Sequence, residues 1–262
     1  MEVGVKGKMI KTWYIDFPAF TGIEKRKVYV YLPKGYGKND KRYPVLYMFD
    51  GHNVFYDSDA TYGKSWGLKE YLDKEKVELI VCAVSCHFGK NDERMQEYCP
   101  YPVIYQKIKE VKVGYGDDTL RWFTEVLKPK IDKKYLTLKD RNNTFLMGSS
   151  MGGLMTVYGL IKYNDVFSKG AALSPAYMIN TKALLKIIKE NEIDESTTLY
   201  TDYGTNDLWP DKSIPLFCKV NTLLVEKGFK VTSRIVEKGL HNEATWEKQL
   251  PFAIKTLMYK AR

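Results

Sequence analysis

The chain has 262 residues, of which 44% are hydrophobic and 28% are charged, and its formal net charge is +9 at pH 7. This length suits one large α/β domain or two small ones, and it can bury a substantial core. The longest apolar runs, such as residues 79–84, are far too short to cross a bilayer, so no membrane partner is expected. The positive charge is spread along the chain without a basic run interleaved with aromatics, which argues against nucleic-acid binding.

The N-terminal segment and the cysteines set further expectations. Residues 1–13, MEVGVKGKMIKTW, lack the apolar region of a secretory signal, which favours a cytoplasmic protein. Four cysteines in a chain of this length do not make a disulfide framework. Cys82, Cys86 and Cys99 lie near His87, but no second C-x2–4-C pair follows them. We therefore expect no metal site and no cofactor.

The predicted elements begin with strands. Residues 9–17 and 25–33 are strand-like and flank the turn-like PAFTGIE, which predicts an antiparallel start to a sheet. Residues 43–51 follow as a buried strand that ends at a glycine. Residues 77–85 have the near-continuous apolar character of a strand covered on both faces.

The remainder of the chain alternates helices and strands. Leu120, Phe123, Leu127 and Ile131 recur at spacings of three and four, which predicts a helix over 119–131. Further strands are predicted at 143–148, 169–174, 197–204 and 230–238, and further helices at 151–161, 181–190, 214–228 and 243–258, the last kinked at Pro251.

This order of elements indicates a single α/β domain over residues 1–262, with a mostly parallel central sheet and helices on both faces. No linker or change of composition divides the chain. Residues 88–118 have weak periodicity and are interrupted by prolines and glycines. Loops of this length in compact domains usually act as lids or binding loops, so we expect this segment to border a substrate site.

A nucleophile elbow is predicted where a strand meets a helix. The segment Gly148-Ser149-Ser150-Met151-Gly152 fits the pattern G-x-S-x-G. The central serine of such a turn adopts strained dihedrals, and the flanking glycines let the chain segments approach closely. Ser149 has no glycine two residues before it, so Ser150 is the better candidate nucleophile.

A serine nucleophile needs a base, and the chain has only three histidines. His241 follows the last predicted strand, on a loop that opens the final helix, and is the preferred base. The orienting carboxylate is expected between them in sequence, after a strand. Asp207 lies on a loop beyond the strand and is preferred, whereas Asp202 lies inside the strand and is the alternative.

Two backbone N–H groups are expected to bind a tetrahedral oxyanion. One belongs to Met151, at the start of the helix that follows the elbow. The second is expected from the loop after an early strand, where Gly51 permits a close turn. Either His52 or Asn53 could supply it, and the His52 side chain is also a candidate substrate contact.

At these residues the chain resembles the esterase branch of the α/β-hydrolases, which includes feruloyl and acetylxylan esterases, S-formylglutathione hydrolase, enterobactin-type siderophore esterases and mycolyltransferases. The resemblance covers about residues 27–255. It is carried by YPVLYMFDGHNVF, ERMQEYCPY, FTEVLKPKIDKKYLT, FLMGSSMGGL, DVFSKGAALSPAYM, YGTND and GLHNEATWEKQLP.

The resemblance implies an α/β-hydrolase fold and the same triad of Ser150, Asp207 and His241. It also places Arg94, Glu97 and Tyr98 near the mouth of the site. Arg94 and Glu97 could equally form an i,i+3 ion pair that orders the long loop. S-formylglutathione hydrolases begin the oxyanion loop with histidine-glycine, whereas this chain has aspartate-glycine. A role in formaldehyde detoxification is therefore disfavoured.

The leading functional hypothesis is a serine carboxylesterase that acts on short-chain acyl or hydroxycinnamoyl esters of carbohydrate, a small-molecule or oligosaccharide substrate. A cytosolic trilactone siderophore esterase is the alternative, and a non-catalytic binding protein of the same fold is a third hypothesis. The oligomeric state stays open. Trp209 is a candidate substrate contact, one of four aromatic residues that could form a wall for a sugar or phenolic ring: Tyr62, Trp66, Trp209 and Trp246.

Overall fold

The computed structural model describes residues 10–87, 93–104 and 111–259. In this part of the chain, eight strands form one sheet in the order β1-β2-β4-β3-β5-β6-β7-β8. The strands are β1 (Ile10–Ala19), β2 (Gly22–Tyr31), β3 (Val45–Met48), β4 (Ile80–Val84), β5 (Thr144–Ser149), β6 (Lys169–Leu173), β7 (Thr198–Gly204) and β8 (Lys230–Val236). β2 pairs antiparallel with β1 and β4, and the other neighbours are parallel, which confirms the predicted mostly parallel sheet with an antiparallel start.

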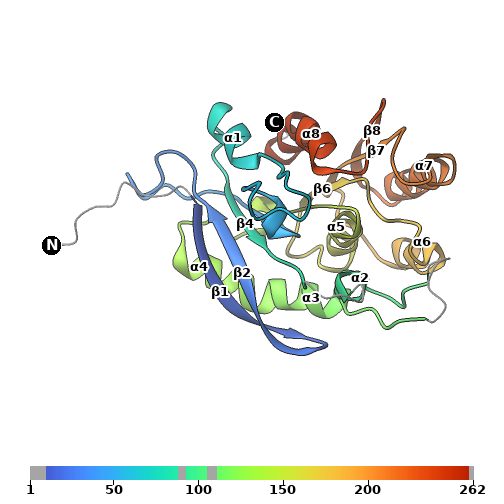
Figure 1. The fold of residues 1–262 in the computed structure, drawn as a ribbon, viewed down its shortest axis with the longest axis horizontal. Helices are drawn as coiled ribbons and strands as arrows, with labels where there is room; N and C mark the ends of the chain where they lie inside the picture. The colour runs from blue at the N-terminus through green and yellow to red at the C-terminus, as the bar shows by residue number, and fades with distance from the viewer. Residues whose placement is uncertain (1–9, 88–92, 105–110, 260–262) are drawn as a thin grey trace.

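Helices cover both faces of this sheet (Figure 1). They are α1 (Leu68–Lys74), α2 (Glu93–Glu97), α3 (Gly116–Trp122), the π-helical η2 (Phe123–Leu127), α4 (Lys128–Lys134), α5 (Met151–Lys162), α6 (Thr181–Glu190), α7 (Pro210–Glu226) and α8 (Glu243–Met258), with short 3₁₀ turns η1 (Gly51–Asn53) and η3 (Arg141–Asn143).

Alternation along the strands produces two core layers. In β3, Val45 and Tyr47 belong to the cluster that packs under α3 to α7, whereas Leu46 and Met48 belong to the cluster under α1 and α8. Successive side chains of a strand point to opposite faces, so a strand buried on both sides is apolar throughout. This arrangement confirms the prediction of helices on both faces.

Several predicted boundaries were wrong. The PAFTGIE segment is not a long turn, because β1 and β2 continue through it and leave only residues 20–21 between them. The helix predicted at 214–228 begins earlier, at Pro210, since proline is well suited to the first turn of a helix. Helix α1 was not predicted. The last helix, by contrast, has the predicted bounds of 243–258 and contains Pro251.

The segment 88–118 is only partly described, because residues 88–92 and 105–110 lie outside the described residues. The described part contains α2, the start of α3 and an antiparallel bridge between Val103 and Lys112. Asn180 anchors this part to the body of the domain, since its backbone N–H donates to the Ile104 carbonyl at 3.0 Å.

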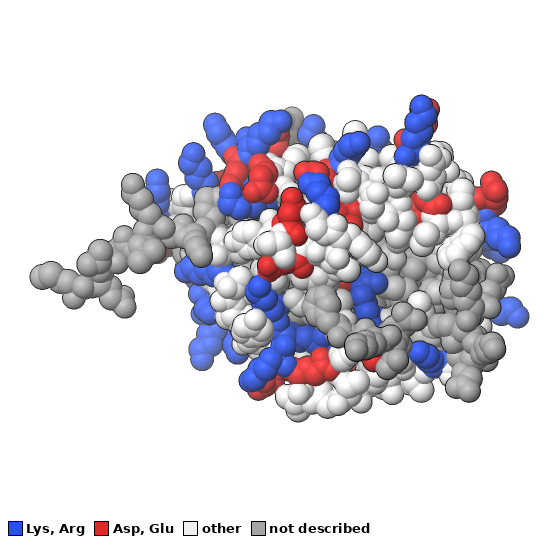
Figure 2. All heavy atoms as spheres, viewed as in Figure 1, with Lys and Arg blue, Asp and Glu red and all other residues white. Residues whose placement is uncertain are grey.

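Charged groups are distributed over the described surface. Figure 2 shows Lys and Arg on every side of the face in view, with Asp and Glu between them rather than one basic patch. Within the described ranges, no helix combines the length and the apolar character needed to span a membrane.

Candidate active site

Ser150 occupies a strained turn between β5 and α5. Its dihedrals, φ 56° and ψ −119°, lie outside the regions that side-chain-bearing residues favour. A Cβ atom at Gly148 would lie 2.6 Å from the Gly152 carbonyl carbon, so only glycine permits this close approach. The backbone of Ser150 is held from both sides, because its N–H donates to the Leu173 carbonyl and its carbonyl accepts from the Ala176 N–H.

His241 lies on the loop between β8 and α8, directly before the helix N-cap. The Asn242 side chain accepts a hydrogen bond from the Thr245 N–H at 2.9 Å, as expected for an asparagine cap. The ends of β7 and β8 approach closely, because a Cβ atom at Gly204 would lie 2.2 Å from the Gly239 carbonyl oxygen. This packing places the loop that carries His241 beside the loop that follows β7.

Asp207, on the loop after β7, contacts His241 directly. His241 Nδ1 donates to Asp207 Oδ1 at 2.7 Å, which leaves Nε2 as the ring nitrogen that can accept a proton. The ring of His241 also packs edge-to-face on Trp246, with the ring centroids 5.1 Å apart. The preferred base and the preferred acid are therefore brought together with the imidazole in a defined orientation.

Ser174 fixes the other oxygen of this carboxylate and was missed in the sequence. Its hydroxyl donates to Asp207 Oδ2 at 2.6 Å and accepts a hydrogen bond from Trp246 Nε1 at 3.0 Å. Burial alone would raise the pKa of Asp207, but the hydrogen bond from His241 and the donor from Ser174 hold that pKa below its ordinary value. The only signal in the sequence was that a serine ends a strand at the same sheet edge.

Asp202, the alternative acid, has different partners. It is buried inside β7, where the Tyr200 hydroxyl donates to Oδ2 at 2.9 Å and the Ser174 N–H donates to Oδ1 at 3.3 Å. Burial raises the pKa of this carboxyl to about 7. Among the described residues, His241 bonds to Asp207 and not to Asp202, which favours Asp207 as the acid.

Replacing Asp202 is expected to stabilise the protein above neutral pH. A carboxyl group whose pKa is raised on folding binds protons more tightly in the native state, so its contribution to stability falls as pH rises from about 4 towards 7. Asp202→Asn removes this loss. Its amide oxygen can still accept from the Ser174 N–H, and its amide nitrogen can donate to the Tyr200 hydroxyl oxygen. We expect its gain in unfolding free energy to be on the order of 2 kcal/mol larger at pH 8 than at pH 5.

Urea titrations of wild type and Asp202→Asn at both pH values would measure this difference. A gain that does not change between pH 5 and pH 8 would contradict the raised pKa of Asp202.

Ser150 and His241 face a common pocket with a volume of about 450 Å³. Its described lining consists of Asp50, His52, Asn53, Thr61, Tyr62, Arg94, Ser149, Ser150, Leu208, His241, Glu243 and Trp246. Within the described part of the chain, no hydrogen bond joins the Ser150 hydroxyl to His241. Such bonds often form only when substrate is present.

The loop after β3 contributes Asp50, His52 and Asn53 to the lining of the pocket. Asp50 has left-handed dihedrals, φ 55° and ψ 47°, and leads into η1. The Asn53 N–H donates to the Asp50 carbonyl at 2.8 Å within this turn, so it is engaged in the turn itself. Of the two predicted donors on this loop, the geometry therefore favours His52. Met151, the other predicted donor, is the first residue of α5, and the N–H groups of a first turn have no partner within the helix.

Arg94 binds Asp50 rather than Glu97. Its Nε and one terminal nitrogen donate to the two oxygens of Asp50 at 2.7 and 2.6 Å, a bidentate pair. Burial alone would raise the pKa of Asp50, but Arg94 holds it below the ordinary range. The Tyr98 hydroxyl accepts a hydrogen bond from the Asp50 N–H at 3.2 Å. The α2 segment thus holds the loop that carries His52 in position. Arg94 lines the pocket, and the alternative of an i,i+3 ion pair with Glu97 is not formed.

Glu97 and Trp209 are not among the described residues that line this pocket, although both were predicted as substrate contacts. Glu97 is buried beneath α2, where Arg26 donates to it at 2.5 Å. Burial outweighs this partner and raises the pKa of Glu97 to about 7. Trp209 lies at the start of α7 with 45% of its surface exposed, and its neighbour Leu208 lines the pocket instead.

Two of the four predicted wall aromatics, Tyr62 and Trp246, line the pocket. Trp66 is not in the described lining and packs against Trp246, with the two ring centroids 5.8 Å apart. The His52 side chain lines the pocket, with its Nε2 lying 3.0 Å from Thr61 Oγ1. Burial lowers the pKa of His52, which favours its neutral form.

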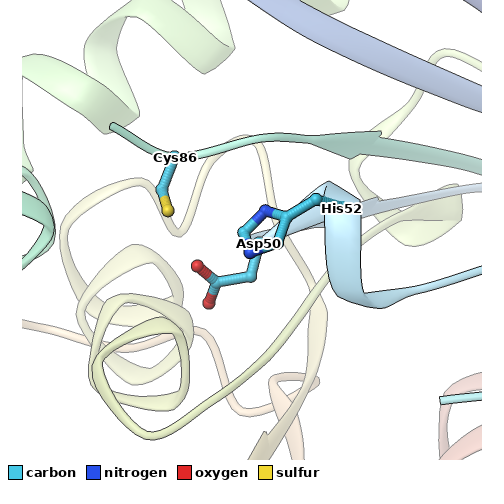
Figure 3. Close-up of side chains that lie close together, drawn as sticks. All are labelled: Asp50, His52 and Cys86. Carbon is cyan, nitrogen blue, oxygen red and sulfur yellow. The ribbon is translucent and has the colours of Figure 1, made fainter. Parts of the chain in front are cut away.

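Asp50, His52 and Cys86 form a cluster with potential ligand atoms within 4.8 Å of one another (Figure 3). The donor types could hold a metal ion, but both oxygens of Asp50 already accept hydrogen bonds from Arg94. A cation bound there would also lie beside the guanidinium, and burial raises the pKa of the Cys86 thiol well above its ordinary value. The cluster is better suited to bracing the loop than to binding a metal.

The sheet order, the strained serine after β5 and the histidine after β8 together define an α/β-hydrolase fold. Residues 23–257 match the family described as "Putative esterase", and the chain belongs to this family.

Two sequence relatives extend this result. The chain is 23% identical over 248 residues to "Uncharacterized protein YbbA" of Bacillus subtilis (strain 168), covering 90% of this chain and 94% of that protein. It is 28% identical over 234 residues to "Endo-1,4-beta-xylanase/feruloyl esterase" of Xylanibacter ruminicola. That match covers 84% of this chain but spans only 28% of the longer relative.

Solved structures share the fold over nearly the full length. A ferulic acid esterase superposes with a TM-score of 0.65 at 21% identity, covering 95% of this chain and 98% of the other. The siderophore hydrolase EstA from Aspergillus nidulans superposes with a TM-score of 0.71 at 15% identity, covering 99% of both chains. These structures show the shared fold, and the match to the family model makes the chain an enzyme of the esterase family.

Proposed function

We propose that the chain is a serine carboxylesterase that uses Ser150 as nucleophile, His241 as general base and Asp207 as the carboxylate that orients the base. One observation carries this proposal: the strained Ser150 and His241 line a single pocket, and Asp207 is bonded to His241 at 2.7 Å. The three residues also follow the chain order of α/β-hydrolase triads.

In the proposed reaction, Ser150 Oγ attacks the ester carbonyl carbon while His241 Nε2 takes the hydroxyl proton. The tetrahedral intermediate collapses, the bond to the alcohol oxygen breaks, and the imidazolium gives its proton to the leaving alcohol. Water then attacks the acyl-enzyme with His241 again as base, which releases the carboxylic acid and restores the serine. Asp207 stabilises the imidazolium at both stages.

The negative charge of each tetrahedral intermediate would be bound by two backbone N–H groups. Met151 provides one from the start of α5, where the helix dipole also favours an anion. His52 provides the second from η1, since Asn53 uses its N–H within the turn. Arg94 keeps this loop in position through Asp50.

We infer that the substrate is a neutral ester, with a short acyl or hydroxycinnamoyl group on a carbohydrate. Tyr62 and Trp246 offer aromatic surface for a sugar or phenolic ring. The relative named as an endo-1,4-beta-xylanase/feruloyl esterase supports the same substrate class.

A trilactone siderophore ester is the second candidate, supported by the fold shared with EstA. Its anionic catecholates would favour a positive pocket. Among the described lining residues, however, Arg94 is the one permanently cationic side chain, and Asp50 neutralises it. The described charges therefore favour the neutral ester.

A hydrolysis panel tests this proposal with p-nitrophenyl acetate and butyrate, methyl ferulate, acetylated xylan and a catecholate trilactone. We expect turnover of the acetate and of at least one carbohydrate-type ester, and each activity should be lost in Ser150→Ala. A clear preference for the trilactone would replace the leading substrate class with the second. Turnover that survives in Ser150→Ala would contradict the mechanism.

A further inference from the structure

Glu243 is a buried carboxyl group in the pocket that the proposed ester chemistry does not use. It is the first residue of α8, two positions after His241, and it lines the pocket together with Ser150 and His241. Only 4% of its surface is exposed. The sequence drew no attention to it, because a glutamate at a helix start is usually explained by the helix dipole.

The carboxyl group of Glu243 differs from the other buried acids of the site in its bonding. Its own backbone N–H donates to it, and the described neighbours Asp50, His241 and Arg94 act on it only through electrostatics. In the described ranges, no side chain donates a hydrogen bond to it. Asp50, by contrast, is bonded by Arg94, and Asp207 by His241.

Such a group is costly to bury, because the carboxylate loses hydrogen bonds to water and its own backbone N–H replaces only part of them. Burial accordingly raises the pKa of Glu243. The cost is removed when a bound ligand supplies the missing donors. Ligand pockets typically carry a few polar groups of this kind, which orient the ligand and select it.

We propose that Glu243 is a specificity-determining residue that accepts hydrogen bonds from hydroxyl groups of a sugar or other polyol ester. This inference rests on the proposed esterase function and names the part of the substrate that the pocket selects. Two neighbouring hydroxyls can match the two oxygens of one carboxylate. Tyr62 and Trp246, which line the same pocket, could pack on the ring that carries them.

The kinetic test compares an ester that carries hydroxyl groups with one that does not. Wild type, Glu243→Gln and Glu243→Ala are assayed on acetylated xylobiose and on p-nitrophenyl acetate. We expect kcat/KM on the sugar ester to fall about 10- to 100-fold in Glu243→Ala, with a smaller loss in Glu243→Gln. On p-nitrophenyl acetate it should change less than about threefold, because no hydroxyl contact is lost.

Glu247→Gln is the matched control. Glu247 lies one turn further along α8 and pairs with Lys64 at 2.8 Å outside the pocket. This variant should behave as wild type on both esters. Thermal unfolding of each variant separates a folding defect from a kinetic effect.

Competition with free glycans tests the contact without turnover of a sugar ester. Xylotriose should inhibit p-nitrophenyl acetate hydrolysis by wild type more strongly than permethylated xylotriose does, and Glu243→Ala should abolish that difference.

Equal losses of kcat/KM on both esters in Glu243→Ala would overturn the proposal, because Glu243 would then act on the triad. The proposal would also be overturned if the ratio of kcat/KM on the sugar ester to kcat/KM on p-nitrophenyl acetate were the same in Glu243→Ala as in wild type. Absence of inhibition by xylotriose would overturn it too. Failure of the esterase function itself is distinguished by the absence of p-nitrophenyl acetate hydrolysis in wild type.

Discussion

Ser150→Ala is expected to abolish ester hydrolysis while leaving the fold intact. The substitution removes the oxygen that would form the acyl-enzyme, and loss of the nucleophile in a serine triad lowers kcat by about 10⁵- to 10⁶-fold. The backbone hydrogen bonds that hold the turn do not depend on the hydroxyl. Steady-state hydrolysis of p-nitrophenyl acetate, with circular dichroism to verify folding, measures the effect.

Labelling with a serine-directed phosphonate provides a second reading of the same variant. Wild type should gain the mass of one phosphonyl group, and Ser150→Ala should gain none. Ser149→Ala is the matched control, because Ser149 ends β5 and also lines the pocket. If labelling is lost in Ser149→Ala and kept in Ser150→Ala, the nucleophile has been assigned to the wrong serine. Complete inertness of wild type would favour the non-catalytic hypothesis.

Asp207→Asn is expected to lower kcat by about 10⁴-fold with little change in structure. An asparagine side chain can present its amide nitrogen to His241, which would leave the ring in the wrong tautomer. The hydroxyl of Ser174 can still donate to the remaining oxygen, so the loop should stay in place. The measurement is kcat at saturating p-nitrophenyl acetate across the pH range.

Asp202→Asn is the control for this assignment, since both carboxyls are buried and both contact Ser174. We expect it to keep kcat within a few-fold of wild type. A larger loss in Asp202→Asn than in Asp207→Asn would show that the acid is Asp202.

Features that depend on neighbouring residues in the sequence could be predicted. The alternation of strands and helices follows from local periodicity, and the structure confirms the resulting sheet. The elbow at Ser150 could be predicted from the sequence, because the close approach of the backbone at positions 148 and 152 requires glycines at a fixed spacing around the serine. Asp207 and His241 could be proposed because parallel strands end at one sheet edge. Their roles stay predictions until the variants are measured.

Features that depend on tertiary packing could not be predicted. Arg94 and Glu97 are three residues apart on α2, yet each pairs with a partner more than forty positions away in the chain, Asp50 and Arg26. The i,i+3 rule predicts pairs within one helix and cannot predict partners from other elements. The candidate role of Glu243 also depends on burial, which its sequence context does not reveal.

Backbone conformation at the site has a consequence for the stability of the enzyme. Three residues at the ends of core strands have positive φ values. Ser150 directly follows β5, Ser174 directly follows β6, and Asp50 lies two residues after the end of β3. Each such residue costs on the order of 1 kcal/mol, and the surrounding packing has to maintain it. The part of the chain proposed to react is thus held in a conformation it would not adopt alone. Substitutions that relax these turns could raise thermal stability while lowering activity. The strained turns persist only while the packing of the surrounding sheet holds them in place.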